Sequence, residues 1–327
     1  MSSFALIACD HGFGHVRRCL LIARELVARA HTVTLFAPRR ATDRFNTADA
    51  IDLVDFATGT TVEGLRGGDA LASAWADRLP SLDHFDVVVS DNLPEVLDIR
   101  PDAVLSGSFF WHLVLDGIDA RIAERAETLL RTHHPRMIGS TIFAMPELEA
   151  RTQLRRVGLC VSGPPPSVPG DALLVACGGT RAMEAPFASL LRQVARRPQP
   201  PFSTVFVEPR LIPADAPPWM LPATFDATMY CRLSAAVCRA GVGTMTECAW
   251  ARARVFSVGE AGNAEVTFNA ARFTELGLGE SALAPDAAFD AACGFVSDPQ
   301  ARAQHLRAAL EVDLDGVRET VDFLTAR

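Results

Sequence analysis

The chain has 327 residues, of which 49% are hydrophobic, and its formal net charge is −8 at pH 7. A chain of this length and composition is not disordered and can form two domains that each bury a core. The acidic balance argues against nucleic acid as the main partner, because a phosphate backbone is normally bound by a basic face.

The distribution of apolar residues also argues against a membrane-spanning protein and against a secreted one. No apolar run approaches the roughly 20 residues that cross a bilayer, so we expect no transmembrane segment. The run from Phe4 to Cys9 is too short for a secretory signal and has no basic region before it. We therefore expect a cytoplasmic protein.

All 31 basic residues are arginine, and the chain has no lysine. This excludes a P-loop lysine and a Schiff-base lysine, so a phosphate would have to be bound by arginine, by backbone N–H groups or by a helix N-terminus. The eight cysteines are spread singly, with no Cys-x-x-Cys pair. We expect reduced, mostly buried thiols and neither a metal site nor a cofactor.

The first strand and helix are predicted on either side of the segment Asp-His-Gly-Phe-Gly-His-Val-Arg-Arg, residues 10–18. Residues 4–9 form a short apolar run, and residues 16–30 show helical periodicity. Gly12 and Gly14 allow a sharp turn and close approach to a ligand, and His15 falls in the first turn of the helix. Strand ends of this kind bind ligands in open α/β sheets. His15 is either a cap or surface residue, or a catalytic base.

A dinucleotide fingerprint is incomplete at this turn, because Arg17 occupies the place of its third glycine. The segment therefore does not indicate a Rossmann dehydrogenase. His11 and His15 have the spacing of a helical metal pair, but the glycines between them disfavour a helix there.

The next two strands are predicted over residues 31–38 and 85–91. Asp91 ends the second of them and should project at the same sheet edge as His15. A carboxylate that accepts a hydrogen bond from an imidazole fixes its tautomer and raises its basicity. Asp91 is therefore either the partner of His15 or the cap of the following helix.

A further strand is predicted over residues 103–111, and its aromatic end includes Phe110 and Trp111. These rings either line an apolar acceptor pocket or belong to the core. A helix is expected over residues 118–131 and a strand over 137–143. Residues 162–170 are rich in proline and glycine and predict a linker between domains 1–161 and 171–327.

The second half begins with a predicted strand, residues 172–177, followed by Gly178, Gly179 and Thr180. Glycines and a hydroxyl at a strand-to-helix junction suit phosphate contact through backbone N–H groups. A strand over residues 202–207 follows.

The strand predicted over residues 235–240 leads into Gly241 and Gly243. Thr244 and Glu247 have the spacing of a capping box, which predicts that the next helix begins at Thr244. Such a helix N-terminus attracts anions. Glu247 is either part of the cap or a carboxylate that accepts hydrogen bonds from a ribose.

The last predicted strand, residues 253–258, precedes a loop that contains Asn263 and Glu265. These two side chains could contact the polar groups of a ligand. Helices are expected over residues 266–276, 301–310 and 314–325. We expect the final helix to pack back on the first domain.

Together the two halves resemble the GT-B fold of nucleotide-sugar-dependent glycosyltransferases, in which two Rossmann-like, doubly wound parallel-sheet domains face a central cleft. Gly-Phe-Gly-His-Val-Arg-Arg in the first half and Arg-Ala-Gly-Val-Gly-Thr-Met-Thr-Glu in the second carry the resemblance. The second segment is similar to the donor-binding segment Gly-x-Gly-Thr-x-x-Glu of the MurG-type and UDP-glycosyltransferase families.

The resemblance implies a role for each matching residue. His15 falls at the position of the general base and Asp91 at that of its partner acid, while Gly12, Phe13 and Gly14 fall beside the acceptor. The donor side would comprise Gly241, Gly243 and Thr244 at the diphosphate with Arg181 or Arg239 near it, Glu247 at the ribose, and Glu265 at the sugar. Val266 stands where the family has a glutamine that contacts the sugar.

Two related families carry similar segments. The opening motif and Cys-Gly-Gly-Thr resemble PseG-type nucleotide-sugar hydrolases, whereas Val-Ser-Asp-Asn-Leu-Pro and Gly-Ser-Phe-Phe-Trp resemble predicted glycosyltransferases related to the N-terminal half of arabinokinases. The second match includes the aromatic residues, so the resemblance favours transfer to an acceptor, either a small molecule or a glycan or lipid. The resemblance to the GT-B families implies an inverting, metal-independent glycosyltransferase with a UDP- or dTDP-linked donor. Hydrolysis of a nucleotide sugar and a non-catalytic nucleotide-sugar-binding protein are the alternatives.

Overall fold

The structure is a computed structural model, and it describes residues 1–10, 13–45, 50–68, 74–178, 182–282 and 284–326. The chain divides into two compact units. Unit 1 comprises Met1–Ser162 and Leu314–Arg327, and unit 2 comprises Gly163–Asp313. Within the described ranges, no helix has the length and apolar character that crossing a membrane requires.

Unit 1 contains a seven-stranded sheet in the order β3-β2-β1-β4-β5-β6-β7, and every neighbouring pair is parallel. The strands are β1 (Ser3–Ile7), β2 (Thr32–Ala37), β3 (Asp52–Asp55), β4 (Val87–Asp91), β5 (Val104–Ser106), β6 (Arg136–Ser140) and β7 (Gln153–Val157).

The helices of unit 1 connect these strands. The α-helices are α1 (Phe13–Ala28), α2 (Arg39–Thr42), α3 (Val62–Gly67), α5 (Trp111–Val114), α6 (Ala120–His133) and α13 (Gly316–Thr325). The 3-10 helices are η1 (Asp43–Phe45), η2 (Trp75–Arg78), η3 (Pro94–Asp98) and η4 (Pro146–Leu148).

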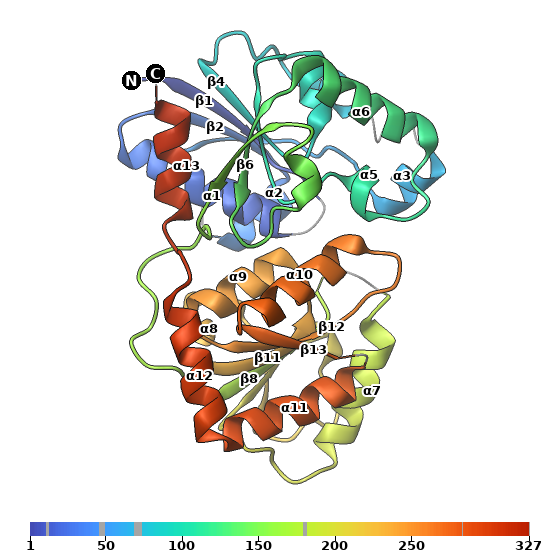
Figure 1. Cartoon of the computed structure of the whole chain (residues 1–327), viewed down its shortest axis with the longest axis vertical. Coiled ribbons are helices and arrows are strands. Elements are labelled where there is room, and N and C mark those ends of the chain that lie inside the picture. The colour runs from blue at the N-terminus through green and yellow to red at the C-terminus, as the bar shows by residue number, and fades with distance from the viewer. Residues whose placement is uncertain (11–12, 46–49, 69–73, 179–181, 283, 327) are drawn as a thin grey trace. The chain divides into compact units, whose positions relative to one another are not determined.

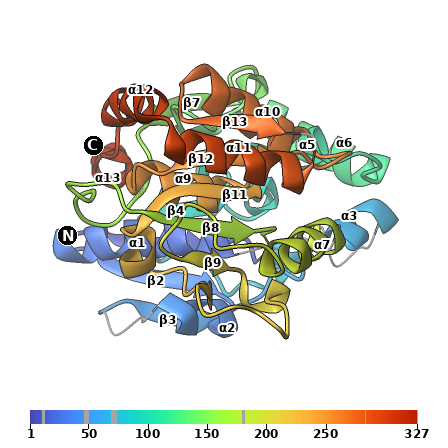
Figure 2. The ribbon, with the colours of Figure 1, turned by 90° about the horizontal axis from the view of Figure 1, so that it is seen from below.

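Unit 2 contains a six-stranded parallel sheet in the order β10-β9-β8-β11-β12-β13, and Figure 2 shows its strands from β13 to β9 following one another. The strands are β8 (Ala172–Ala176), β9 (Val205–Val207), β10 (Met220–Pro222), β11 (Leu233–Arg239), β12 (Arg254–Val258) and β13 (Gly279–Ala282). The helices are α7 (Glu184–Ala195), η5 (Pro209–Leu211), α8 (Ala227–Tyr230), α9 (Val242–Trp250), α10 (Ala264–Glu275), α11 (Pro285–Ser297) and α12 (Pro299–Leu310).

Both sheets follow the doubly wound order, in which the chain builds outward from a first strand and then returns to its other side. The strand order therefore reverses between β1 and β4 in unit 1 and between β8 and β11 in unit 2. Ligands of open α/β sheets bind beyond the carboxyl ends of the strands at this reversal. The predicted fold class, two parallel doubly wound α/β sheets, is confirmed.

The buried strand β1 supplies both faces of the core of unit 1. Phe4 and Leu6 face a cluster formed with α1 and α13, whereas Ala5 and Ile7 face a cluster formed with η2, η3 and α6. This alternation follows from the period of two along a strand. A continuous apolar run is what a strand covered on both faces requires.

In unit 2, α7 and α11 cover one face of the sheet, and α9 and α10 lie over the other (Figure 1). Leu173 and Val175 of β8 pack with Phe187 of α7 and Phe289 of α11 in the first of these layers. Apolar residues at helical spacing thus bury the sheet from both sides.

The last helix, α13, belongs to unit 1, although it follows unit 2 in the chain. Figure 1 shows it beside α1, and Val321 and Leu324 contribute its buried face. Arg29 of the segment after α1 also donates to Asp322 at 2.5 Å. The predicted linker 162–170 begins at Ser162, where the first of the two segments of unit 1 ends.

Several element boundaries differ from those predicted. The helix α9 begins at Val242 with Gly241 as N-cap and no side-chain cap, so the predicted capping box of Thr244 and Glu247 is wrong. Thr244 lies inside the first turn because the chain already enters the helix at Val242, directly after the extended Gly241. The sequence analysis did not predict α11 or the short edge strands β3, β7, β10 and β13.

Replacing Leu324 with alanine should lower the free energy of unfolding by about 2–5 kcal/mol, because the side chain is buried in the α1 layer. The change should appear in the urea transition that unfolds unit 1. Leu310 of α12 is 55% exposed; Leu310→Ala is therefore the control. An equal, small effect of both changes would show that α13 does not stabilise unit 1.

Candidate functional site

The centre of the site in unit 1 is the carboxylate of Asp91, which is completely buried at the end of β4. His15 Nδ1 lies 2.6 Å from Asp91 Oδ1. Arg18 binds the same carboxylate through two nitrogens, with Nε 2.7 Å from Oδ2 and Nη2 2.8 Å from Oδ1. The structure thus pairs Asp91 with His15, and the alternative of a helix cap does not describe its contacts.

Two weaker donors complete the surroundings of Asp91. Ser106 Oγ, at the end of β5, donates to Oδ2 at 3.1 Å, and the Cys19 thiol donates to the same oxygen at 3.8 Å. Both carboxylate oxygens therefore accept hydrogen bonds, as a buried charge requires.

The fold places these groups together at the reversal of the strand order. β1 and β4 are parallel neighbours with Ile7 opposite Ser90, so the turn after β1 and the end of β4 share one sheet edge. His15 and Arg18 are three residues apart on α1 and therefore lie on the same helix face. Asp91 is one residue beyond Ser90 and meets both.

The charges of this cluster fix its protonation. Burial would raise the pKa of Asp91, but the charges of Arg18 and His15 and their hydrogen bonds lower that pKa well below its usual range. Asp91 is therefore ionised at neutral pH and can only accept hydrogen bonds. Because of this, Nδ1 of His15 carries a proton, and the lone pair of the neutral ring lies on Nε2.

The aromatic residues beside His15 differ in their exposure. The Trp111 ring centroid lies 6.3 Å from that of His15, and Phe109 packs edge-on against Trp111 at 4.9 Å. Phe13 is 47% exposed and contacts Phe45. Phe109 is only 3% exposed, whereas Trp111 is partly exposed, so Trp111 and Phe13 are the rings of this group that reach the surface.

Phe110 was also predicted to line an acceptor pocket, but its position in the structure differs from that prediction. It is fully buried in the core cluster of unit 1 and stacks on His112. The strand predicted over residues 103–111 ends at Ser106, and Phe110 is the N-cap of α5, from which its ring packs into that cluster. The predicted contact of Phe110 with an acceptor is therefore not supported.

In unit 2, the N-terminus of α9 is the candidate anion site. Gly241, Gly243 and Thr244 lie in the turn and first helical turn after β11, and Gly243 is exposed. The first N–H groups of a helix have no intrahelical partner, and the helix dipole is positive there. Of the residues predicted at the donor diphosphate, Gly243 and Thr244 present first-turn N–H groups that have no intrahelical partner. The N–H of Gly241 instead donates to the carbonyl oxygen of Arg239 at 2.8 Å.

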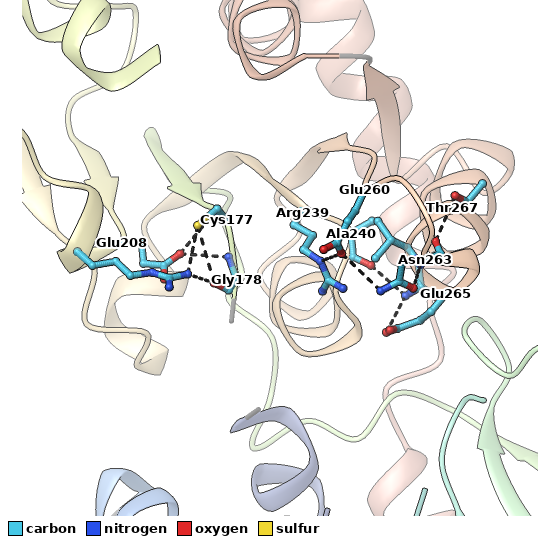
Figure 3. A network of polar contacts seen from close by, with 12 residues as sticks. Cys177, Gly178, Glu208, Arg239, Ala240, Glu260, Asn263, Glu265 and Thr267 are labelled. Carbon is cyan, nitrogen blue, oxygen red and sulfur yellow. Dashed lines mark hydrogen bonds and ion pairs between the residues drawn. The ribbon is translucent and has the colours of Figure 1, made fainter. Parts of the chain in front are cut away.

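Arg239, the last residue of β11, lies beside this turn. Its Nη1 is 3.3 Å from where a Cβ on Gly241 would be, and its Cδ is 3.8 Å from the equivalent position on Gly178. Glu260 holds Arg239 through a 2.6 Å contact between Oε2 and Nε, and Asn263 donates to the same oxygen at 3.4 Å (Figure 3). The guanidinium is thereby held between the ends of β8 and β11, where unit 2 reverses its strand order.

The backbone N–H groups after the end of β8 already donate to a glutamate side chain of unit 2. Glu208 Oε2 accepts hydrogen bonds from the backbone N–H groups of Cys177 at 2.9 Å and Gly178 at 3.1 Å (Figure 3). Arg210 holds Glu208 at 2.6 Å and also contacts the carbonyl oxygen of Gly178. The predicted phosphate contact through the N–H of Gly178 is therefore not available in this arrangement. Gly12, Gly179, Thr180 and Arg181 lie outside the described residues.

The polar residues predicted near the ribose and sugar are engaged within unit 2. Glu247 is 4% exposed inside α9. Asn263 Oδ1 caps α10 by accepting from the N–H of Val266 at 3.4 Å. Glu265 Oε1 accepts from Asn269, whose Nδ2 also donates to the carbonyl of Ala240 at 2.9 Å. Glu265 thus supports the turn that leads to Gly241 (Figure 3).

The residues of these sites that the sequence analysis missed include Arg18, Ser106, Glu208 and Glu260. Arg18 follows His15 by three residues, and this spacing on a helix indicates a shared face. Ser106 ends a strand that was predicted to reach the same edge as β4. Glu208 follows β9 directly, but its contact with β8 depends on the pairing of these strands.

No family model matches the chain, and no curated protein matches it by sequence. Solved structures match over nearly the full length. The calicheamicin glycosyltransferase CalG4 matches with a TM-score of 0.64 and 17% identity, covering 98% of this chain and 96% of that chain.

MurG of Acinetobacter baumannii has a TM-score of 0.59 and 16% identity, with 99% of each chain covered. LpCGTa, solved in complex with UDP, has a TM-score of 0.68 and 13% identity, with 99% of each chain covered. The chain therefore has the GT-B glycosyltransferase-like fold that its segments resemble.

Replacing Asp91 with asparagine should lower the free energy of unfolding at pH 7 by about 3–5 kcal/mol, because Arg18 and His15 lose a buried charge partner. The folded pKa of Asp91 lies below the unfolded value of about 3.9. Its stabilisation is therefore present above that pH and is lost as the pH falls. Urea unfolding at pH 7 and pH 3 should show a smaller difference between the proteins at pH 3, and a difference independent of pH would contradict this assignment.

Proposed function

We propose that the protein is an inverting, metal-independent glycosyltransferase that moves a sugar from a nucleotide diphosphate donor to an acceptor hydroxyl. The observation that carries the proposal is the buried Asp91 carboxylate bound to His15 Nδ1 at the strand-order reversal of a GT-B-like fold. His15 Nε2 makes no hydrogen bond to any residue in the described ranges, and the side chain is 14% exposed. A ring held in this way is suited to accept a proton.

In the proposed reaction, His15 Nε2 takes the proton of the acceptor hydroxyl as its oxygen attacks the anomeric carbon. The new carbon–oxygen bond forms as the bond from the anomeric carbon to the diphosphate oxygen breaks, and the leaving diphosphate keeps the electron pair. Attack opposite the leaving group inverts the anomeric configuration. The ionised Asp91 stabilises the imidazolium that forms.

The proposed donor contacts lie in unit 2. The N-terminus of α9, from Val242 to Thr244, and the guanidinium of Arg239 would stabilise the charge of the leaving diphosphate. Arginine is the only side chain with a permanent positive charge in this chain. Fixed charges of this kind supply the stabilisation that a metal ion gives in other transferases, which supports metal independence.

The proposed partners are a nucleotide sugar and an acceptor that is a small molecule, a glycan or a lipid, in the cytoplasm. A UDP- or dTDP-linked donor is supported by the LpCGTa complex with UDP, in which a similar fold holds that nucleotide. Trp111 beside His15 supports an acceptor with an apolar part. Val266 is fully buried, so sugar recognition would rely on groups other than the glutamine of the family.

The donor site is tested by calorimetric titration with UDP and dTDP. Arg239→Gln should weaken binding about 10- to 100-fold, because a charged hydrogen bond to phosphate is lost. Arg232 precedes the opposite end of the same strand and contacts Thr204, so Arg232→Gln is the control and should bind like the unchanged protein. Absence of binding by the unchanged protein would contradict the donor assignment.

The base is tested by His15→Ala. Turnover should fall about 10²- to 10⁴-fold, since general-base assistance is lost, while UDP affinity stays the same. Nucleotide release from UDP-glucose and dTDP-glucose is measured with and without a panel of phenols, sugars and lipid alcohols. Release without an acceptor would establish a hydrolase, and binding without turnover in either protein would establish a non-catalytic binder.

A further inference from the structure

Arg18 of α1 contacts both members of the His15–Asp91 pair. Its guanidinium makes a two-point contact with the buried Asp91, and its Nη2 also lies 3.5 Å from His15 Nδ1. Both Arg18 and His15 direct N–H groups at the same carboxylate. The contact between Arg18 and His15 is therefore one between two donors and not a hydrogen bond.

The other ionisable groups near this carboxylate do not offset the charge of Arg18. On α1, burial raises the pKa of the Cys19 thiol. On the segment after β7, burial raises the pKa of the Cys160 thiol to about 11, so both thiols are neutral at neutral pH. Glu319 of α13 accepts from the N–H of Gly158 at 2.8 Å and acts on Cys160. The neighbours on β4 and β5 are Asp91 itself and the uncharged Ser106.

We propose that Arg18 is a positioning residue that balances the charge of the His15–Asp91 pair and orients the His15 ring. This inference rests on the proposed role of His15 as a base. The two-point contact fixes the plane of the carboxylate, and with it the direction in which His15 Nε2 points. At the same time the positive charge of Arg18 opposes the formation of the imidazolium.

The charge of Arg18 has a consequence for the protonation of His15. An Asp91–His15 pair without Arg18 would favour the imidazolium, because the buried negative charge would have only the histidine ring to pair with. With Arg18 present, both oxygens of Asp91 are already paired with a positive charge, which opposes protonation of the Nε2 lone pair. Turnover should therefore continue to lower pH than in a site with the aspartate and histidine alone.

The charge effect is tested by the NMR titration of the His15 ring in the full chain, with His15→Ala identifying its signal among the eight histidines. Arg18→Gln should move the titration midpoint of His15 upward by about 1–3 pH units. Arg17→Gln removes the same charge from the neighbouring residue of α1 and should move the midpoint less. A midpoint that is unchanged in Arg18→Gln would overturn the proposal.

The geometric effect is tested by Arg18→Lys, which keeps a charge for Asp91 and so preserves the fold if Arg18→Gln does not. Lysine cannot form the planar two-point contact. We expect the His15 midpoint to stay close to that of the unchanged protein, while kcat falls and the KM for the donor does not change. Full kcat in Arg18→Lys would overturn the positioning role.

The NMR readout also separates this inference from the proposed function. A midpoint that moves in a protein with no turnover would refute the transferase and leave the charge balance standing. Turnover whose acid limb lies at the same pH in Arg18→Gln as in the unchanged protein would support the transferase and refute the charge balance.

Discussion

The site of unit 1 depends on one buried charge, the carboxylate of Asp91. A carboxylate without solvent is unfavourable unless both oxygens are hydrogen-bonded and a positive charge is close. Arg18 supplies that charge at 2.7 and 2.8 Å, and Ser106 supplies a further donor. These contacts leave one oxygen directed at His15, so the requirements of burial also determine the tautomer of the ring.

The two units share the same strand order but carry different functional groups. Each reverses its order beside the first strand, and each places its polar groups there. Unit 1 combines an acid, an imidazole and an aromatic ring, whereas unit 2 combines a helix N-terminus with an arginine held by Glu260. The loops decide the chemistry, because the strands that carry them are buried on both faces.

The fold and the pairing of His15 with Asp91 could be predicted from the sequence, because apolar runs mark buried strands and strand ends meet at one edge. The capping box at Thr244 was wrong, because the helix begins two residues earlier, at Val242, and Thr244 already lies in its first turn. The burial of Phe110 and the binding of the Gly178 N–H by Glu208 depend on tertiary packing and strand pairing. Short edge strands carry too few residues for a period of two to be recognised.

The central claim is that Asp91 fixes His15 with its lone pair on Nε2. The most direct measurement is a long-range ¹H–¹⁵N correlation spectrum of the ¹⁵N-labelled full chain above the titration midpoint of His15. The account predicts a protonated Nδ1 and an unprotonated Nε2 in the unchanged protein, and loss of this preference in Asp91→Asn. A proton on Nε2 in the unchanged protein, or the same tautomer in both proteins, would contradict it.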